Sequence, residues 1–385
     1  MPPTTYRLGD RGPAIAEIRD RLALLGLLAG ASTLSYDDAE FDEAVDRAVR
    51  QFQQARGTTV DGIVGAQTWR LLDEARWRLG DRVLSYAVTH PMIGDDVAVL
   101  QRRLGEMGFD CGRVDGVFGR RTEQALKEFQ RNVGIGADGT CGPDTFKALD
   151  RLVRTVRGGA AHAFRESEAM RRSGPTLAGK VVVIDPGHGG VDRGIQAHGL
   201  DEAEIAEDLA ARIEGRLGVQ GVTAYLSRGR LAADEEPPDE VTRAAFANDA
   251  QADLLLSLHV DGQKTPTANG VATYYFGSRA TGWHSVIGER LAELVLHEVV
   301  ARTDLRDCRP HDRTWDLLRL SRMPAVRLEL GYLSHPGDAA RLADPAFRDT
   351  VAEAVVSAVQ TLFLPEGALA SDVADLREPS LMPAQ

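Results

Sequence analysis

The sequence predicts a multidomain protein in which two small all-α three-helix modules precede an α/β domain with a mostly parallel sheet. Two observations lead to this prediction. The signals of three short amphipathic helices occur twice within residues 6–152. From about residue 180 onward, short apolar runs alternate with helical patterns, which is typical of strands and helices in a parallel sheet. We therefore expect modules at residues 6–75 and 91–152 and an α/β domain at residues 180–364.

Composition marks a linker and a tail. Residues 157–179 hold a Gly-Gly pair and a Ser-Gly-Pro turn among charged residues, which predicts a linker with a short helix around residues 165–172. Residues 365–385 are small, polar and rich in proline, so we expect a flexible tail.

The overall composition limits the classes of partner. The chain has 385 residues, of which 43% are hydrophobic and 26% are charged, enough for a sizeable core. The 45 Lys and Arg residues against 57 Asp and Glu residues give a net charge of −12. Sequence-independent nucleic-acid binding and adhesion to an anionic membrane are therefore poor candidates. The longest apolar stretch, residues 22–31, is shorter than the roughly 20 residues that a membrane span needs, so no membrane span is expected.

The cysteines predict neither a disulfide framework nor a cysteine zinc site. There are 3 of them, Cys111, Cys141 and Cys308, and no CxxC motif. Buried free thiols are the expectation. A bridge between Cys111 and Cys141, which lie in one module, stays open at this point.

The repeat in the first 152 residues is carried by a Phe-Gln pair and an Asp-Gly turn. Phe52-Gln53 and Asp61-Gly62 recur in the same order and at the same spacing as Phe129-Gln130 and Asp138-Gly139. The first copy holds extra loop near residues 30–36. Because glycine readily adopts a positive φ, we expect these residues to fix turns and helix starts rather than to bind a ligand.

In the α/β region, apolar β-branched runs mark strands, and apolar residues spaced three or four apart mark helices. The predicted strands are residues 181–185, 223–227, 253–260 and 325–331. The predicted helices are residues 202–217, 242–250, 288–302 and 350–363. Ligands of a parallel sheet bind beyond the carboxyl ends of its strands, so polar residues at those ends are the functional candidates.

Four polar side chains stand at such positions. His188 follows the first strand in the stretch DPGHGG, His259 ends the third strand and Glu329 ends the fourth. Glu202 opens the helix after the first loop, whereas Glu204 fits a capping box. Two imidazoles, a carboxylate and an open position suit a catalytic zinc ion, and a further carboxylate can act as general base.

Each of these residues also has a structural interpretation. His188 fits a loop histidine, His259 a satisfied core histidine, and Glu202 a carboxylate that complements a helix dipole. Glu329 stands among apolar residues, where an unpaired carboxylate would be costly, and that cost favours a function. Four such residues at strand or helix ends of one domain favour a zinc site.

This region resembles the zinc-dependent N-acetylmuramoyl-L-alanine amidase family of the amidase-3 type. The resemblance is carried by VVVIDPGHGGVDRG (181–194), EAEIAEDLA (202–210), RAAFANDAQADLLLSLHVD (243–261), GVATYYF (270–276) and PAVRLELGYLSHPGD (324–338). It implies that His188, Glu202 and His259 bind Zn²⁺. It further implies that Glu329 is the catalytic glutamate, which takes a proton from activated water and returns it to the departing alanine nitrogen.

The sequence departs from that family at two places without losing a ligand. Val260-Asp261 stands where the family often has Ala-Asn, and Ala203 stands where it has a lysine. The remaining histidines of this region are expected to be surface or packing residues: His198, His284, His297, His311 and His335.

The repeated modules resemble the peptidoglycan-binding-like modules of bacterial wall enzymes, on VDGIVGAQTW (60–69) and ADGTCGPDTF (137–146). Both resemblances imply a peptidoglycan or muropeptide substrate. They imply hydrolysis of the amide between the lactyl group of N-acetylmuramic acid and L-alanine of the stem peptide.

Two other functions stay open at this point. The chain as written begins without a signal peptide, which predicts a cytoplasmic protein, or a cell-wall protein if the start is truncated or export takes another route. One alternative is therefore a cytoplasmic, non-catalytic regulator or sensor of peptidoglycan precursor synthesis built on an amidase fold. The other is a wall-targeted binding protein. The presence of all four candidate residues favours the enzyme.

Overall fold

The computed structural model of the chain describes residues 5–29, 38–153, 161–263, 265–278 and 282–364. Three features of the sequence-based prediction lie outside the described residues. They are the extra loop at 30–36, the start of the linker at 157–160 and the tail at 365–385.

The chain forms two compact units. The module unit contains the residues up to 166 together with residues 276–285 and 312–322, and the α/β unit contains the rest. Two segments within the range predicted for the α/β domain, 180–364, therefore belong to the module unit.

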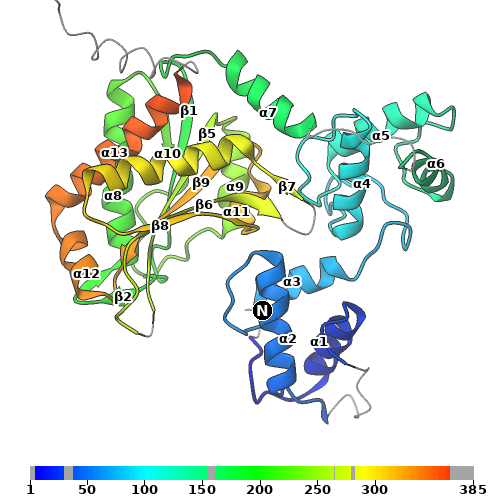
Figure 1. The fold of residues 1–385 in the computed structure, drawn as a ribbon, viewed down its shortest axis with the longest axis horizontal. Helices are drawn as coiled ribbons and strands as arrows, with labels where there is room; N and C mark the ends of the chain where they lie inside the picture. Colours follow the sequence, from blue (N-terminus) through cyan, green and yellow to red (C-terminus); the bar gives the residue numbers. More distant parts are fainter. Residues whose placement is uncertain (1–4, 30–37, 154–160, 264, 279–281, 365–385) are drawn as a thin grey trace, which may run out of the picture. The chain divides into compact units, whose positions relative to one another are not determined.

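The module unit contains two sets of three helices, as predicted (Figure 1). The first set is α1 (Pro13–Leu24), α2 (Glu43–Arg56) and α3 (Ala66–Ala75), and the second is α4 (Asp95–Glu106), α5 (Arg120–Asn132) and α6 (Pro143–Val153). Each set buries its own apolar stripe, with Ile18, Val49 and Phe52 in the first core. Leu100 and Phe129 occupy the equivalent positions in the second core.

A buried glutamine at the end of α2 organises the Asp-Gly turn of the first module. The Gln53 side chain donates to Asp61 Oδ1 at 2.7 Å and to Thr68 Oγ1 at 3.2 Å. Its Oε1 accepts from the Gly62 amide at 2.9 Å. Gly62 has a φ of 75°, a conformation that glycine adopts without a steric penalty. These residues thus fix the turn and the start of α3.

The second module contains this network twice. Each copy has a glutamine, an Asp-Gly turn and a threonine: Gln130 with Asp138-Gly139 and Thr145, and Gln101 with Asp115-Gly116 and Thr122. The sequence analysis found the first of these two copies and missed the second. In the missed copy the glutamine lies farther from its turn along the chain, so a constant spacing does not reveal it.

Two thiols are buried in the second module, and they form no disulfide with each other. Cys111 and Cys141 are free cysteines, as is the half-buried Cys308 of the α/β unit. Burial raises the pKa of the Cys111 and Cys141 thiols to about 12. The bridge that the sequence left open is therefore not formed in this structure.

A buried ion pair in the module unit joins α3 to α11 (Asp316–Leu320). Arg319 Nη1 donates to Glu74 Oε2 at 2.7 Å, Arg319 Nη2 donates to Glu74 Oε1 at 3.1 Å, and both side chains are 10% exposed. Asp316 lies 3.5 Å from the same guanidinium and also pairs with Arg70. The later segment is thereby fastened to the first module.

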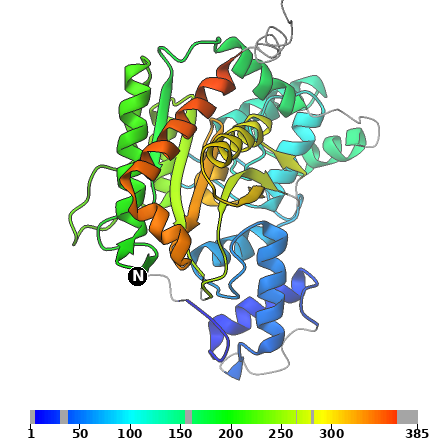
Figure 2. The same cartoon turned by 60° about the vertical axis from the view of Figure 1, so that its left-hand side comes forward.

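The α/β unit is built on a mostly parallel sheet, as predicted (Figure 2). The strands of the sheet are β1 (Val181–Pro186), β4 (Thr223–Leu226), β5 (Leu254–Asp261), β6 (Val271–Ser278), β7 (Trp283–His284), β8 (Asp307–Arg313) and β9 (Ala325–Tyr332). Of these, β7 and the last residues of β6 and β8 fall in the two segments assigned to the module unit. The strand order is β4-β1-β5-β9-β6-β7, with β8 paired to β6. The first four strands of this order are parallel, and β6 is antiparallel to β9.

The helices of this unit are α8 (Glu202–Val219), α9 (Glu240–Asp249), α10 (Val286–Arg302), α12 (Pro336–Ala343) and α13 (Pro345–Phe363), and the boundary between the two units falls within α7 (Ala161–Arg172). A two-stranded hairpin of β2 (Gln196–Ala197) and β3 (Leu200–Asp201) precedes α8. Sequence analysis did not predict β8, because its sequence DCRPHDR is polar and holds a proline. Within the described ranges, no helix combines the length and the apolar character that a bilayer crossing requires.

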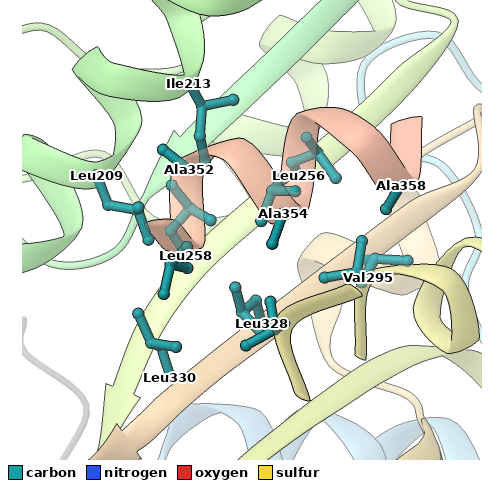
Figure 3. Close-up of a cluster of buried hydrophobic side chains, with 14 of the residues drawn as sticks. Leu209, Ile213, Leu256, Leu258, Val295, Leu328, Leu330, Ala352, Ala354 and Ala358 are labelled. Carbon is teal, nitrogen blue, oxygen red and sulfur yellow. The ribbon is translucent and has the colours of Figure 1, made fainter. Parts of the chain in front are cut away.

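Alternation along the strands separates an apolar face from a face that carries the polar candidates. Successive side chains of a strand point to opposite faces. On β5 and β9, one set of alternate residues joins the apolar cluster with α8, α10 and α13: Leu256, Leu258, Leu328 and Leu330 (Figure 3). The intervening residues point the other way: Ser257, His259, Arg327 and Glu329. Both His259 and Glu329 therefore lie on the face away from this cluster.

We expect Glu74→Ala to destabilise the module unit by about 2–4 kcal/mol, because it leaves the Arg319 guanidinium buried with a single weaker partner. Urea unfolding followed by far-UV circular dichroism measures this change. The matched control is Arg11→Ala, which breaks an exposed pair with Glu40 and should cost under about 1 kcal/mol. Equal, small effects of both variants would show that the buried pair does not stabilise the unit.

Candidate metal centre

A strained loop after β1 presents His188. The residue has a φ of 57°, uncommon for a side chain with a Cβ, and it lies between glycines. Arg228 holds this loop, because its Nε and Nη2 donate to the carbonyls of Pro186 and Gly187, each at 3.0 Å. A Cβ on Gly187 would lie 2.2 Å from the His259 ring, so only glycine lets the loop approach that ring.

The start of α8 presents Glu202. Asp201 caps this helix by accepting from the Glu204 amide at 3.0 Å, while the Glu204 carboxylate binds Arg193 at 2.8 Å. The Glu202 carboxylate accepts from the Ile195 amide at 3.0 Å. Glu202 is therefore held by the backbone and turned inward, whereas Glu204 has a structural role.

His188, Glu202 and His259 converge, and we call them the His–Glu–His cluster. Glu202 Oε1 lies 2.8 Å from His259 Nδ1 and 3.2 Å from His188 Nε2. One ligand atom from each residue lies within 4.8 Å of the other two, and no other group of this kind occurs in the described part of the chain. Atoms bound to one tetrahedral zinc ion at about 2.0–2.1 Å lie roughly 3.3 Å apart. The donor set thus fits zinc in both chemistry and spacing.

The second nitrogen of His259 tests the alternative of a core histidine. His259 is 4% exposed, and its Nε2 is buried without a hydrogen-bond partner among the described residues. A satisfied core histidine would pair this atom, since buried polar atoms are almost always hydrogen-bonded. The unpaired Nε2 therefore argues against the interpretation of His259 as a satisfied core histidine.

Burial and mutual hydrogen bonds set the protonation of the cluster. Burial, aided by the charge of Arg327, lowers the pKa of His259 to about 3, so its imidazole is neutral at physiological pH. Burial alone would raise the pKa of Glu202, but hydrogen bonds from His188 and His259 outweigh it and lower that pKa well below its usual value. A carboxylate anion and a neutral imidazole are the forms that bind a metal.

His188 has a partner of its own. Its Nδ1 lies 2.7 Å from Asp192 Oδ2, an arrangement that orients a ligand imidazole and increases its basicity. Burial opposes protonation of His188, but Glu202 and Asp192 outweigh burial and raise its pKa. Asp192 was not among the residues predicted from the sequence, although it follows His188 by four residues in the same loop.

Glu329 lies beside the cluster on the neighbouring strand. It is 8% exposed, and β9 pairs with β5 so that Glu329 stands opposite His259. Burial raises the pKa of Glu329 to about 7, against the opposing charge of Arg327. Arg327 Nε donates to Glu329 Oε1 at 2.7 Å. A carboxyl group that titrates near neutrality can both accept and donate a proton, which general acid–base catalysis requires.

A second buried cluster, which was not predicted from the sequence, lies at the end of β1, directly before the His188 loop. The Asp185 carboxylate is fully buried and accepts from Arg243 Nη1 at 2.9 Å and from Ser257 Oγ at 2.7 Å. Arg228, which donates to two carbonyls of the loop, directly follows the predicted strand 223–227. Asp185 and Arg228 thus both lie at the ends of predicted strands, and this position could have identified them from the sequence.

The other histidines of the α/β sequence lie apart from the cluster. His198, His284 and His297 are exposed. His311 lies against the ring of Tyr274, and His335 caps α12. These are surface and packing positions, in agreement with the expectation from the sequence.

We expect the protein to bind one Zn²⁺ per chain and to lose it in His259→Ala, because two ligands leave an incomplete site. Metal analysis after dialysis measures this. His297→Ala, which removes an exposed histidine, is the control and should keep the full zinc content. Equal zinc content in all three proteins would contradict the ligand assignment.

Zinc affinity should fall as the pH falls. His188 has a raised pKa, so it becomes protonated first when the pH drops, and a protonated imidazole cannot bind a metal. The Kd for zinc, measured by competition with a chelating dye, should rise about tenfold for each pH unit below that pKa. Asp192→Asn, which removes one group that raises the pKa, should shift the onset to lower pH. A Kd that stays constant between about pH 5 and 8 would contradict this account.

Comparison with known proteins agrees with this geometry. Residues 182–361 match the N-acetylmuramoyl-L-alanine amidase family, and residues 11–72 and 93–149 match a putative peptidoglycan binding domain. N-acetylmuramoyl-L-alanine amidase CwlM of Mycobacterium tuberculosis is 48% identical over 367 residues, which cover 93% of this chain and 89% of CwlM.

Two other similarities each cover about half of this chain. N-acetylmuramoyl-L-alanine amidase LytC of Bacillus subtilis is 31% identical over 179 residues, which cover 46% of this chain and 34% of LytC. The crystal structure of an N-acetylmuramoyl-L-alanine amidase from Clostridium difficile 630 is 29% identical, with a TM-score of 0.43, over 48% of this chain and 97% of that one. With a relative similar over nearly its whole length, this chain belongs to the N-acetylmuramoyl-L-alanine amidase family.

Proposed function

We propose that the protein is a zinc-dependent hydrolase of peptidoglycan or its fragments. It cleaves the amide between the lactyl group of N-acetylmuramic acid and L-alanine of the stem peptide. The observation that carries this proposal is the convergence of His188, Glu202 and His259, with Glu329 opposite His259 on the paired strand. The family to which the chain belongs supports the choice of bond.

Three residues of the proposed site would hold the metal, and a fourth would transfer the proton. His188, Glu202 and His259 would hold the zinc ion, which as a Lewis acid polarises the amide carbonyl and activates water. Glu329 accepts the proton of the attacking water and delivers it to the nitrogen of the departing alanine. Its pKa of about 7 makes both directions of transfer accessible near neutral pH.

The modules would hold the polymer. Their match to a putative peptidoglycan binding domain supports a role in keeping the glycan near the α/β unit. Within each module, the repeated glutamine networks use the Asp-Gly and threonine side chains internally. Their internal hydrogen bonds support a structural role for these residues.

Glu329→Gln should reduce release of stem peptide from muropeptides by at least about 100-fold while zinc content stays unchanged, because the amide cannot accept the proton. Chromatography of the released peptides and metal analysis measure the two quantities. The control is Glu353→Gln, an exposed position on α13, which should have wild-type activity.

The same assay separates the alternatives. A non-catalytic regulator or binding protein would show no release from the wild type, with or without zinc. Full activity of Glu329→Gln would refute the assignment of the base while leaving the hydrolase itself in place.

A further inference from the structure

Arg327 is a largely buried cation directly beside Glu329. It lies two residues earlier on β9, so both side chains point to the same face of the sheet. The guanidinium Nε donates to Glu329 Oε1 at 2.7 Å, and the two side chains are 18% and 10% exposed. On the other side of β9, the paired residue on β6 is Tyr274.

A second carboxylate anchors the other end of the guanidinium. Arg327 Nη1 donates to Glu240 Oε1 at 3.3 Å, and Glu240 begins α9 directly after the N-cap residue Asp239. Arginine presents its donors in a rigid planar fork, so a contact at each end fixes the orientation of the group. Arg327 thus connects Glu240 on α9 to Glu329 through two hydrogen bonds, a connection that we call the strut.

The burial of a cation at this position calls for an explanation. Its neighbours along β9, Val326 and Leu328, belong to the apolar cluster on the opposite face, so the fold requires no charge at position 327. Removing a guanidinium from water is costly unless its charge is paired and its donors are hydrogen-bonded. Here two of its partners are carboxylates, and one of them is the carboxylate that the proposed reaction uses.

We propose that Arg327 is a positioning residue for the hydrolysis, one that fixes the carboxylate of Glu329 and assigns its two oxygens different tasks. This inference rests on the proposed function. Because Oε1 accepts from Arg327, the other oxygen, Oε2, takes the proton from water and returns it to the leaving nitrogen. Misplacing a catalytic group by about 1 Å can cost 100-fold in rate, so loss of the strut should act mainly on kcat.

The first test compares steady-state kinetics and zinc content. Arg327→Met should lower kcat about 10- to 100-fold with KM and zinc content unchanged. Arg327→Lys, which keeps a cation without the fork, should recover part of that loss. The matched control is Arg348→Met, which removes an arginine of similar exposure (14%) that pairs with Asp208, and its kcat should equal that of the wild type.

The decisive test is a double-mutant cycle. If Arg327 acts through Glu329, Arg327→Met should lower the residual rate of Glu329→Gln by less than twofold. A loss as large as in the wild-type background, or a kcat for Arg327→Met within twofold of the wild type, would overturn the proposal. Should Arg327→Met fail to fold, Glu240→Ala removes the carboxylate on α9 that pairs with Arg327 and should lower kcat several-fold in the same pattern.

A measurement without catalysis keeps this inference separate from the proposed function. In the metal-free protein, Arg327→Met and Glu329→Gln should change the Tm non-additively, because each removes one charge of the same ion pair. Additive shifts would show that the two side chains are not coupled and would overturn the inference. If the wild type releases no stem peptide with zinc, the proposed function is wrong, and the Tm cycle alone decides whether Arg327 holds Glu329.

Discussion

The carboxylate of Glu202, shared between two imidazoles in a buried position, is the interaction on which the site depends. A buried carboxylate is costly unless its charge is matched, and here His188, His259 and two backbone amides match it. These partners belong to separate parts of the chain, so the loop after β1, the start of α8 and the end of β5 must all meet. A Cβ on Gly194 would lie 2.5 Å from Glu202 Oε2, so the close packing also requires glycine there.

Glu202 and Glu329 are two buried carboxylates of this site whose pKa values are shifted in opposite directions. Glu202 receives hydrogen bonds from two imidazoles, which lower its pKa, whereas burial dominates at Glu329 and raises its pKa to about 7. Environments that separate two pKa values in this way assign one group to charge and the other to proton transfer. At Glu202 the two imidazoles outweigh burial, whereas at Glu329 burial outweighs the opposing charge of Arg327, which Glu240 shares.

The two compact units do not follow one another in a linear order along the chain. Residues 276–285 and 312–322 come from the amidase part of the sequence yet belong to the module unit, where Arg319 pairs with Glu74. The predicted linker, residues 157–179, is therefore one of several places where the chain passes from one unit to the other. Such pairings between residues far apart in the sequence leave no periodic pattern, and sequence analysis had no means to detect them.

Local patterns in the sequence were enough to determine the three-helix modules, the parallel strands and the four candidate residues at strand and helix ends. Hydrophobic periodicity is a local property, and the carboxyl ends of parallel strands meet at one edge whatever the details of packing. Only the tertiary structure decided that Glu202 Oε1 bridges two imidazoles, that Asp192 and Arg228 orient the His188 loop, and that Arg327 connects Glu240 to Glu329. Those contacts depend on which side chains the folded chain brings within about 3 Å, a distance that hydrogen bonding requires and sequence spacing does not contain.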